Sequence, residues 1–174
     1  LIDALSYIKS DKNINEVILS GGDPLMAKDD AISWFLDELE QIPQIKRMRI
    51  HSRLPVVIPA RITEQLCERF AKSPLKIIFV NHINHANEID NDFKNAMNML
   101  KKADVLLLNQ AVILKDVNDT VDAQINLSEA LFDADVLPYY LHLLDKVEGA
   151  SHFDIDEQQA IKIQAELLKA LPGF

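Results

Sequence analysis

Apolar and polar residues follow one another in blocks whose length and spacing predict a regular succession of strands and helices. Segments that predict strands lie at 16–19, 47–53, 76–80, 104–110 and 137–144, and apart from the short segment 47–53 they contain the apolar runs typical of buried strands. Between these runs, apolar residues recur three or four positions apart, which is the spacing of one helix face. The clearest example is 29–40, where Ile32, Phe35, Leu36 and Leu39 fit a single amphipathic helix.

The remaining helices are predicted from the same periodicity and from residues that favour helix starts. One helix covers 2–8, another runs from the N-cap Thr63 to about residue 72, and Asp90 begins a third. Two further helices pass through 125–131 and begin near Asp156. The prolines that bound 54–59 predict an extended loop there.

Strand and helix alternate throughout, with connections long enough for right-handed crossovers between parallel strands. Five strands are too few to close an eight-stranded barrel. The sequence therefore predicts an α/β fold, a partial (open) parallel β/α barrel with about five βα units, occupying residues 1–174 as one domain. A doubly wound sheet is the second choice. The open edges of such a sheet can pair with other chains, which is compatible with a homo-oligomer.

Composition narrows the class of protein. The net charge of −9 over 174 residues argues against nucleic-acid binding, and no apolar run reaches the roughly 20 residues of a membrane span. The chain starts without a basic, signal-like segment and without Met, which suggests an excised fragment. Cys67 is the only cysteine, so a reducing cytoplasmic setting is expected and the chain alone cannot hold an iron–sulfur cluster.

The first strand ends in the segment Ser20–Leu25, which combines two glycines, a carboxylate and a proline. The glycines allow a sharp turn and a close approach to a ligand, and Pro24 stops the strand. Asp23 is thereby placed at the strand tip as an acceptor suited to an ammonium or hydroxyl group. An ordinary strand-to-helix turn would explain the segment taken by itself.

Later strands also end in polar residues, which is the observation that favours a functional site. These residues are Ser20 to Asp23, His51 to Arg53, Asn81 to His85, Asn109 with Gln110, and His142 with Asp145. In parallel α/β folds the carboxyl ends of the strands converge on the ligand. Dinucleotide, P-loop and nucleophile-elbow signatures are absent from the sequence.

Several members of this set have more than one interpretation. His82 and His85, expected in a loop, suit hydrogen bonding or stacking against a flat ligand, loop capping or, less readily, metal binding. Arg53 and Arg61 suit a phosphate or carboxylate, or surface ion pairs. Together with Asp23 and Asp145, these residues favour a small zwitterionic ligand, and the argument from the residues alone ends there.

The same segments resemble the lysine 2,3-aminomutases, which are radical S-adenosylmethionine (SAM) enzymes. The resemblance runs almost end to end through 17–25, 49–63, 84–89, 109–119 and 138–153. The form Pro138-Tyr139-Tyr140-Leu141-His142-Leu143-Leu144-Asp145-Lys146-Val147 is most similar to the branch that makes (R)-β-lysine for elongation factor P.

The resemblance implies roles for individual residues, position by position. Ser20, Gly21, Gly22 and Asp23 match the segment that receives the methionine end of SAM, with Asp23 at its ammonium group, and His82 and Gln110 match positions that line the SAM site. Asp145 matches the carboxylate that holds the side-chain ammonium of lysine. Candidates for binding pyridoxal phosphate (PLP) or a carboxylate are Arg53, Arg61 and His142, the last of which replaces a tyrosine of better-known relatives.

For a complete protein the resemblance implies a [4Fe-4S] cluster, SAM and PLP, with lysine as substrate. SAM cleaved at the cluster yields a radical that takes hydrogen from the β-carbon of PLP-bound lysine, after which nitrogen migrates from Cα to Cβ. Elongation factor P and its ligase would use the product. The cluster-binding Cys-x3-Cys-x2-Cys triplet is expected upstream of Ser20 and the PLP lysine downstream of residue 174.

The chain is therefore interpreted as the central part of the enzyme, inactive alone, with no catalytic or metal-ligating residue of its own. The first alternative is another radical SAM aminomutase, acting on free lysine or on glutamate. The second is a non-catalytic module that binds a small ligand.

Overall fold

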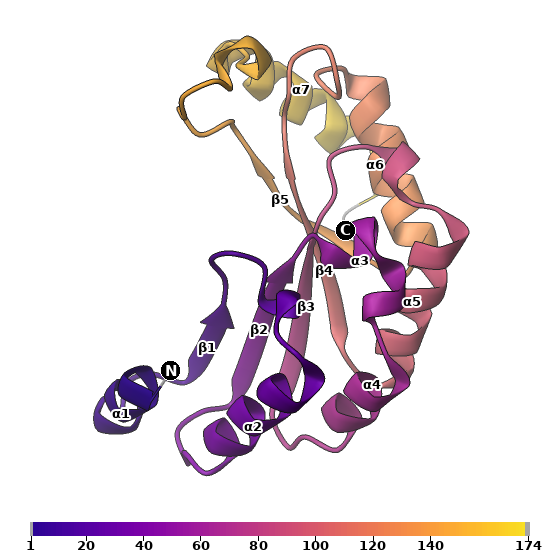
Figure 1. The fold of residues 1–174 in the computed structure, drawn as a ribbon. Coiled ribbons are helices and arrows are strands. Elements are labelled where there is room, and N and C mark those ends of the chain that lie inside the picture. Colours follow the sequence, from indigo (N-terminus) through magenta and orange to yellow (C-terminus); the bar gives the residue numbers. More distant parts are fainter. Residues whose placement is uncertain (1, 173–174) are drawn as a thin grey trace.

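The centre of the molecule is one parallel sheet, seen in a computed structural model that describes residues 2–172. Five strands lie side by side in chain order, and each pairs in parallel with the next. They are β1 (Glu16–Leu19), β2 (Arg47–Ser52), β3 (Lys76–His82), β4 (Leu106–Val112) and β5 (Leu137–His142). The predicted α/β fold with an open parallel sheet is confirmed (Figure 1).

Helices connect the strands as the periodicity predicts. They are α1 (Ile2–Ser10), α2 (Asp29–Glu40), α3 (Leu54–Val57), α4 (Glu64–Ala71), α5 (Asn91–Lys102), α6 (Val121–Asp133) and α7 (Glu157–Ala170). Short 3-10 turns lie at η1 (Pro24–Met26), η2 (Pro59–Arg61), η3 (Ala86–Glu88) and η4 (Ser151–Phe153). The predicted cap Thr63 is present, and Asp90 and Asp156, at or near which helices were predicted to begin, are caps too: all three side chains accept hydrogen bonds from the first turns of α4, α5 and α7.

Four local predictions were wrong, one about a loop and three about strand ends. The segment 54–59 is not an extended loop: Leu54–Val57 form α3 and Pro59 begins η2, because a proline is accepted in the first turn of a helix. β3 continues to His82, which therefore lies on the strand and not in the loop after it. β4 also extends to Val112, two residues beyond the predicted end, and β5 ends at His142.

The sheet has two different faces. Along β2, buried residues alternate with half-buried ones, so Met48, Ile50 and Ser52 face one side and Arg47, Arg49 and His51 the other. The first side packs on the helices in one hydrophobic core that includes Phe79 of β3 and Phe93 of α5. We call the opposite side, which carries Arg49 and His51, the open face of the sheet.

The last strand and helix are attached less tightly than the others. α7 packs mainly on α6, and only Ile113, Ala160 and Ile163 form the small buried cluster beneath it. All residues of β5 are exposed except the half-buried Pro138. Within residues 2–172, none of the helices has the length and apolar character needed to cross a membrane.

Candidate functional site

The tip of β1 is fastened to the tip of β2 through the carboxylate of Asp23. Its Oδ1 accepts hydrogen bonds from Leu25 N (3.0 Å) and Ser52 Oγ (2.7 Å), and its Oδ2 accepts from Arg53 N (2.9 Å) and Leu54 N (3.1 Å). A carboxylate offers about four lone-pair positions. Asp23 therefore already has a full set of donors, and an approaching ammonium group must share them.

The two glycines before Asp23 have a conformational role. Gly21 and Gly22 have φ angles of +87° and +57°, in the left-handed region that favours glycine. A Cβ added at either position would meet nothing within 4 Å, so space at the tip is open. The turn thus presents exposed backbone at the end of β1, as expected for a segment that receives a ligand.

Arg53 ties the tip of β2 to β3 and to the loop that follows. Its Nη1 donates to the backbone oxygen of His82 (3.2 Å), and its Nη2 pairs with Glu88 Oε2 (2.5 Å). Glu88 Oε1 in turn accepts from the backbone N–H groups of Asn84 and His85. Arg53 is half-exposed, so its guanidinium remains accessible at the rim while it organises the β3 loop.

Arg61 is bound to protein groups through its whole guanidinium. Nε donates to the Leu25 carbonyl (2.6 Å), Nη2 to the Ala27 carbonyl (2.7 Å), and Nη1 pairs with Asp29 Oδ1 (2.6 Å). The side chain is 16% exposed. In this structure Arg61 holds the loop between β1 and α2, and its predicted role in anion binding stays a prediction.

Two histidines from neighbouring strands meet on the open face. The rings of His51 and His82 lie with centroids 5.7 Å apart, edge to face. Gln110 of β4 is level with His82 in the strand register and lies close to His51. Both Nε2 atoms are buried without a well-aligned hydrogen-bond partner, which is unusual for buried polar atoms. Both atoms are shielded from solvent, and their hydrogen-bonding capacity is not used by well-aligned partners in the part of the chain that the structure describes.

The electrostatic surroundings keep both imidazoles neutral at pH 7. Burial lowers the pKa of His51 below its usual 6.5, and the positive charge of Arg49 lowers it further. Burial also lowers the pKa of His82, with His51 as the next cause, and Asp23 opposes this fall. A neutral imidazole has one donor and one acceptor nitrogen, so each ring can serve either kind of ligand atom.

An aromatic group from β5 faces the same surface. The rings of Tyr139 and Tyr140 lie 3.9 Å apart, their hydroxyls are joined by a 3.0 Å hydrogen bond, and His142 is 5.2 Å from Tyr140. His142 is also one of the groups that lower the pKa of His82. The open face thus collects aromatic and polar groups from β2, β3, β4 and β5.

Asp145 is the predicted site residue that the structure does not join to the others. It lies in the exposed loop between β5 and α7. Among the described residues, its carboxylate forms no hydrogen bond or ion pair with Asp23, Arg53, His82 or Gln110. By contrast, Asp23, Arg53 and His82 are linked by hydrogen bonds at the strand tips, and Gln110 lies beside His82.

Other polar residues at the strand ends have structural roles. Asn109 is buried on the helix side of β4 and bonds both the N–H and the carbonyl of Ile83. Asn118 likewise bonds Leu114 N and the carbonyls of Asn84 and Val112. The Nδ1 atom of His85 accepts from Asn87 N, which is the loop-capping interpretation of this histidine. These amides fix the loops that surround the site.

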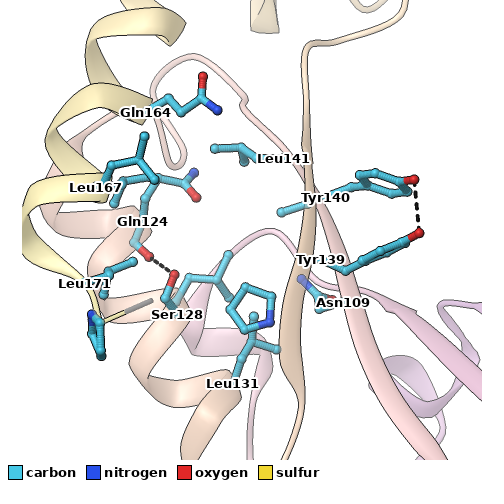
Figure 2. A pocket seen from close by; sticks show the side chains of 15 residues that line it. Asn109, Gln124, Ser128, Leu131, Tyr139, Tyr140, Leu141, Gln164, Leu167 and Leu171 are labelled. Atoms are coloured by element: carbon cyan, nitrogen blue, oxygen red, sulfur yellow. Dashed lines mark hydrogen bonds between the residues drawn. The ribbon is translucent and has the colours of Figure 1, made fainter. Parts of the chain in front are cut away.

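A cavity of about 560 Å³ lies on the other side of β5, between that strand and helices α6 and α7 (Figure 2). Leu131, Leu141 and Leu167 contribute to its apolar lining, and no charged side chain occurs among the described residues that line it. The hydroxyl of Ser128 donates to the Gln124 carbonyl (2.9 Å). The cavity therefore lacks the charged groups that a zwitterionic ligand requires, whereas the open face has them.

The described residues do not fit a metal cluster. No group of three or more His, Cys, Asp or Glu residues in the 2–172 segment is placed to hold a metal ion. The thiol of Cys67 is buried in the core, and burial raises its pKa to about 11, so it is a poor metal ligand. An iron–sulfur cluster would need ligands from elsewhere.

Two charged residues of the open face, Glu16 and Arg49, were not identified from the sequence. They form an ion pair between β1 and β2, with Arg49 Nη2 3.1 Å from Glu16 Oε1. The signal was present in Arg47 to His51, where polar and apolar residues alternate, which places Arg49 and His51 on one face of the strand.

Comparison with known proteins gives relatives that match nearly the whole chain. No protein-family model matches it. It is 58% identical over 171 residues to an L-lysine 2,3-aminomutase of Escherichia coli, covering 98% of this chain and 50% of that protein. The L-lysine 2,3-aminomutase of Haemophilus influenzae is 54% identical and is covered to 51%. A glutamate 2,3-aminomutase of Clostridioides difficile is 33% identical over 166 residues, covering 95% of this chain and 39% of that protein.

The chain thus spans about half the length of the curated relatives it matches. Among solved structures, a radical SAM methyltransferase, TsrM of Kitasatospora setae, superposes with a TM-score of 0.59 at 8% identity, covering 99% of this chain and 46% of that protein. At this identity the likeness concerns the fold alone. The predicted resemblance is confirmed along the span of this chain, and the fold agrees with it.

Proposed function

We propose, from the premise that this chain is part of a lysine 2,3-aminomutase, that the complete protein is a radical SAM enzyme that converts L-lysine to β-lysine. The observation that carries the proposal is the 58% identity over 98% of the chain to a protein named L-lysine 2,3-aminomutase. The finer assignment, (R)-β-lysine destined for elongation factor P, is supported by the form of the segment 138–147.

The residues of this chain would bind and orient SAM, PLP and lysine, and would not ligate the cluster. When bound, a [4Fe-4S] cluster with SAM supplies the radical that removes hydrogen, and PLP holds the amino group that migrates. The only cysteine, Cys67, is buried in the core, so the cluster ligands belong to another part of the complete protein. Likewise, we expect this chain to be inactive when produced alone.

The SAM site is proposed at the tips of β1, β3 and β4. The turn at Gly21 and Gly22 offers open space and exposed backbone beside Asp23. The unpaired Nε2 of His82, with Gln110 beside it, provides a hydrogen-bonding group facing the same region. Because Asp23 already accepts four hydrogen bonds, its contribution to an ammonium group is electrostatic and shared with those donors.

The substrate end is proposed at β5. Asp145 is exposed and its carboxylate has no partner among the described residues, so it can accept the side-chain ammonium of lysine. His142 continues the row of rings from Tyr139 and Tyr140, whose flat faces suit a pyridine ring. Arg53, half-exposed at the rim, is the proposed anion-binding residue for the cofactor phosphate or the substrate carboxylate.

The proposal is tested on the complete protein with its cluster reconstituted. The protein is incubated with SAM, PLP, a low-potential reductant and either L-lysine or L-glutamate, and the amino acids are resolved by chiral chromatography with mass detection. Formation of (R)-β-lysine is expected. Turnover of glutamate but not of lysine would show that glutamate is the substrate. If neither amino acid were converted but a ligand bound tightly, the protein would be a binding module.

The link to elongation factor P is tested separately. Purified product is offered, in parallel with free L-lysine, to the ligase that modifies elongation factor P. We expect the β-lysine to be transferred in preference to lysine. Equal use of both amino acids would contradict this branch assignment and leave the aminomutase activity unaffected.

A further inference from the structure

The turn η3, which follows β3, holds the carboxylate of Glu88 in a fixed position. Its Oε1 accepts hydrogen bonds from Asn84 N (2.8 Å) and His85 N (2.9 Å), and the side chain of His85 accepts one from Asn87 N. This reciprocal capping box keeps the Glu88 side chain only 20% exposed. Its other oxygen, Oε2, pairs with the guanidinium of Arg53.

Arg53 is in turn held by groups from three segments at the tip of β2. Its backbone N donates to Asp23 Oδ2 (2.9 Å), and its Nη1 donates to the carbonyl of His82 (3.2 Å). Its Nη2 donates to Glu88 Oε2 (2.5 Å). The guanidinium is therefore fixed by two acceptors, one at the end of β3 and one in the turn that follows it.

The guanidinium of Arg53 still has N–H groups to offer. A guanidinium carries more donors than these two bonds use, in a planar and rigid fork. Among residues 2–172, none accepts a hydrogen bond from Arg53 Nε, and the side chain is 48% exposed. Arg61, by contrast, is 16% exposed and uses all three nitrogens in bonds to the loop after β1. Of these two arginines, Arg53 is the one that can bind an anion without losing its protein partners.

Glu88 has two opposite effects on an anion that approaches Arg53. Its negative charge repels the anion, whereas its hydrogen bond keeps the fork from rotating. The repulsion is weakened by water and salt, because the guanidinium is half-exposed. The geometric effect is not screened, because paired hydrogen bonds from a guanidinium to a carboxylate or phosphate require a defined orientation. We therefore expect the geometric effect of Glu88 to exceed its repulsion.

We infer that Glu88 is a positioning residue, which fixes the guanidinium of Arg53 so that its remaining N–H groups bind an anionic oxygen group, a phosphate or a carboxylate, at the strand tips. This inference rests on the proposed function, which gives Arg53 the cofactor phosphate or the substrate carboxylate. Glu88 itself does not touch the ligand. Loss of its carboxylate lowers the affinity for the anion, although the loss makes the net charge at the strand tips more positive.

The anchoring is tested first, without reference to activity. Phenylglyoxal modifies accessible guanidinium groups, and peptide mapping by mass spectrometry gives the rate of modification of Arg53 in the complete protein. In Glu88→Gln the amide keeps one oxygen for the two backbone N–H groups but presents NH2 to Arg53, so the pair is lost while the turn is capped. Arg53 should then react about 3-fold faster than in the parent. An unchanged rate would overturn the inference.

Asp37→Asn is the matched control for the loss of one negative charge. Asp37 is exposed on α2 and pairs with Arg69 Nη2 (2.6 Å), so this variant also breaks an arginine–carboxylate pair. Arg53 should react at the parent rate in Asp37→Asn. A rate increased as much as in Glu88→Gln would mean that net charge sets the reactivity of Arg53, and it would contradict the anchoring by Glu88.

Anion binding is then measured with two pairs of ligands that separate the two sources of the anion. PLP is compared with pyridoxal, which lacks the phosphate, by absorbance titration of the complete protein prepared without PLP. L-lysine, through its KM, is compared with the inhibitor 1,5-diaminopentane, which lacks the carboxylate. Glu88→Gln should weaken binding of PLP alone or of lysine alone about 10-fold and leave pyridoxal and 1,5-diaminopentane unchanged.

The ligand that loses affinity identifies the anion. A loss for PLP assigns Arg53 to the phosphate, and a loss for lysine assigns it to the carboxylate. Tighter binding of either ligand would show that the repulsion by Glu88 exceeds its geometric effect, and it would overturn the inference. No change in either ligand, an equal loss for the ligand without the anion, or a loss confined to SAM would overturn it as well.

A double-mutant cycle tests whether Glu88 acts through Arg53. Arg53→Lys keeps the charge but not the fork, so it should weaken the same ligand, and adding Glu88→Gln should weaken it little further. Losses that add fully would contradict the inference. With PLP and lysine both saturating, Glu88→Gln should approach the parent kcat, since the loss concerns binding. If the parent itself formed no β-lysine, the proposed function would fail, while the phenylglyoxal rates would still decide the anchoring.

Discussion

Replacing Asp23 with asparagine is expected to loosen the joined tips of β1 and β2. The carboxylate accepts hydrogen bonds from Leu25 N, Ser52 Oγ, Arg53 N and Leu54 N, and Ser52 is 1% exposed. An asparagine has one acceptor oxygen, so two of the four donors would face an amide NH2 group and the other two would lose a charged acceptor.

The size of the effect follows from those bonds. A hydrogen bond to a charged group contributes about 1.5–3 kcal/mol net, and an unpaired buried donor costs about 1–3 kcal/mol. Because the four bonds share one group they are not additive, and we expect Asp23→Asn to lower the free energy of unfolding by about 2–4 kcal/mol. Asp30→Asn, an exposed neighbour in the first turn of α2, should change it by less than about 1 kcal/mol.

The assay is urea unfolding of the complete protein, combined with hydrogen exchange read by mass spectrometry. In Asp23→Asn, peptides that contain Leu25, Arg53 and Leu54 should exchange faster, while peptides from α5 should be unchanged. If Asp23 served only to bind SAM, stability and exchange would match the parent and only SAM affinity would fall. That result would refute the structural account of this residue.

Three further predictions address other parts of the chain. In nitrogen-detected NMR, His51 and His82 should protonate with pKa values below 6.5, and a pKa of 6.5 or more for either would contradict the effect of their surroundings. Because the unfolded state then binds more protons than the folded state, the free energy of unfolding should fall as the pH drops below about 6.5. Burial raises the pKa of Cys67 to about 11, so its thiol should resist iodoacetamide at pH 8 in the native protein and react after unfolding. Peptide mapping measures the alkylation, and rapid alkylation of the native protein would contradict the burial of Cys67. Asp145→Asn in the complete enzyme should impair lysine turnover far more than SAM cleavage, and equal loss of both would count against its role at the substrate ammonium.

Much of the architecture could be predicted because local signals agree with the tertiary structure. The helix predicted at 29–40 is α2, Asp29–Glu40, since its apolar spacing and its buried face coincide. Thr63 was identified as a cap and Asp90 as a helix start, because a short polar side chain before an apolar face is typical of a helix N-terminus.

The site was harder to predict because its geometry depends on pairing between distant segments. The pairing of β5 with β4 shifts at Tyr139, and such a bulge depends on the register of the two strands, so no local pattern could place Tyr139 and Tyr140 on one face. Similarly, the four donors around Asp23 come from its own turn and from the end of β2 and the start of α3, about 30 residues later. Sequence reasoning identified Asp23 as an acceptor at the tip, but it could not identify the N–H groups of Leu25, Arg53 and Leu54 that donate to its carboxylate.

The central claim is that ligands bind the open face of the sheet and not the cavity between β5 and helices α6 and α7. The most direct measurement is a crystal structure of the complete protein with its cluster and SAM bound. The account predicts SAM atoms within hydrogen-bonding distance of His82 or Gln110, beside the Gly21–Gly22 turn. SAM lying against Leu131 and Leu167, with His82 and Gln110 unoccupied, would contradict it.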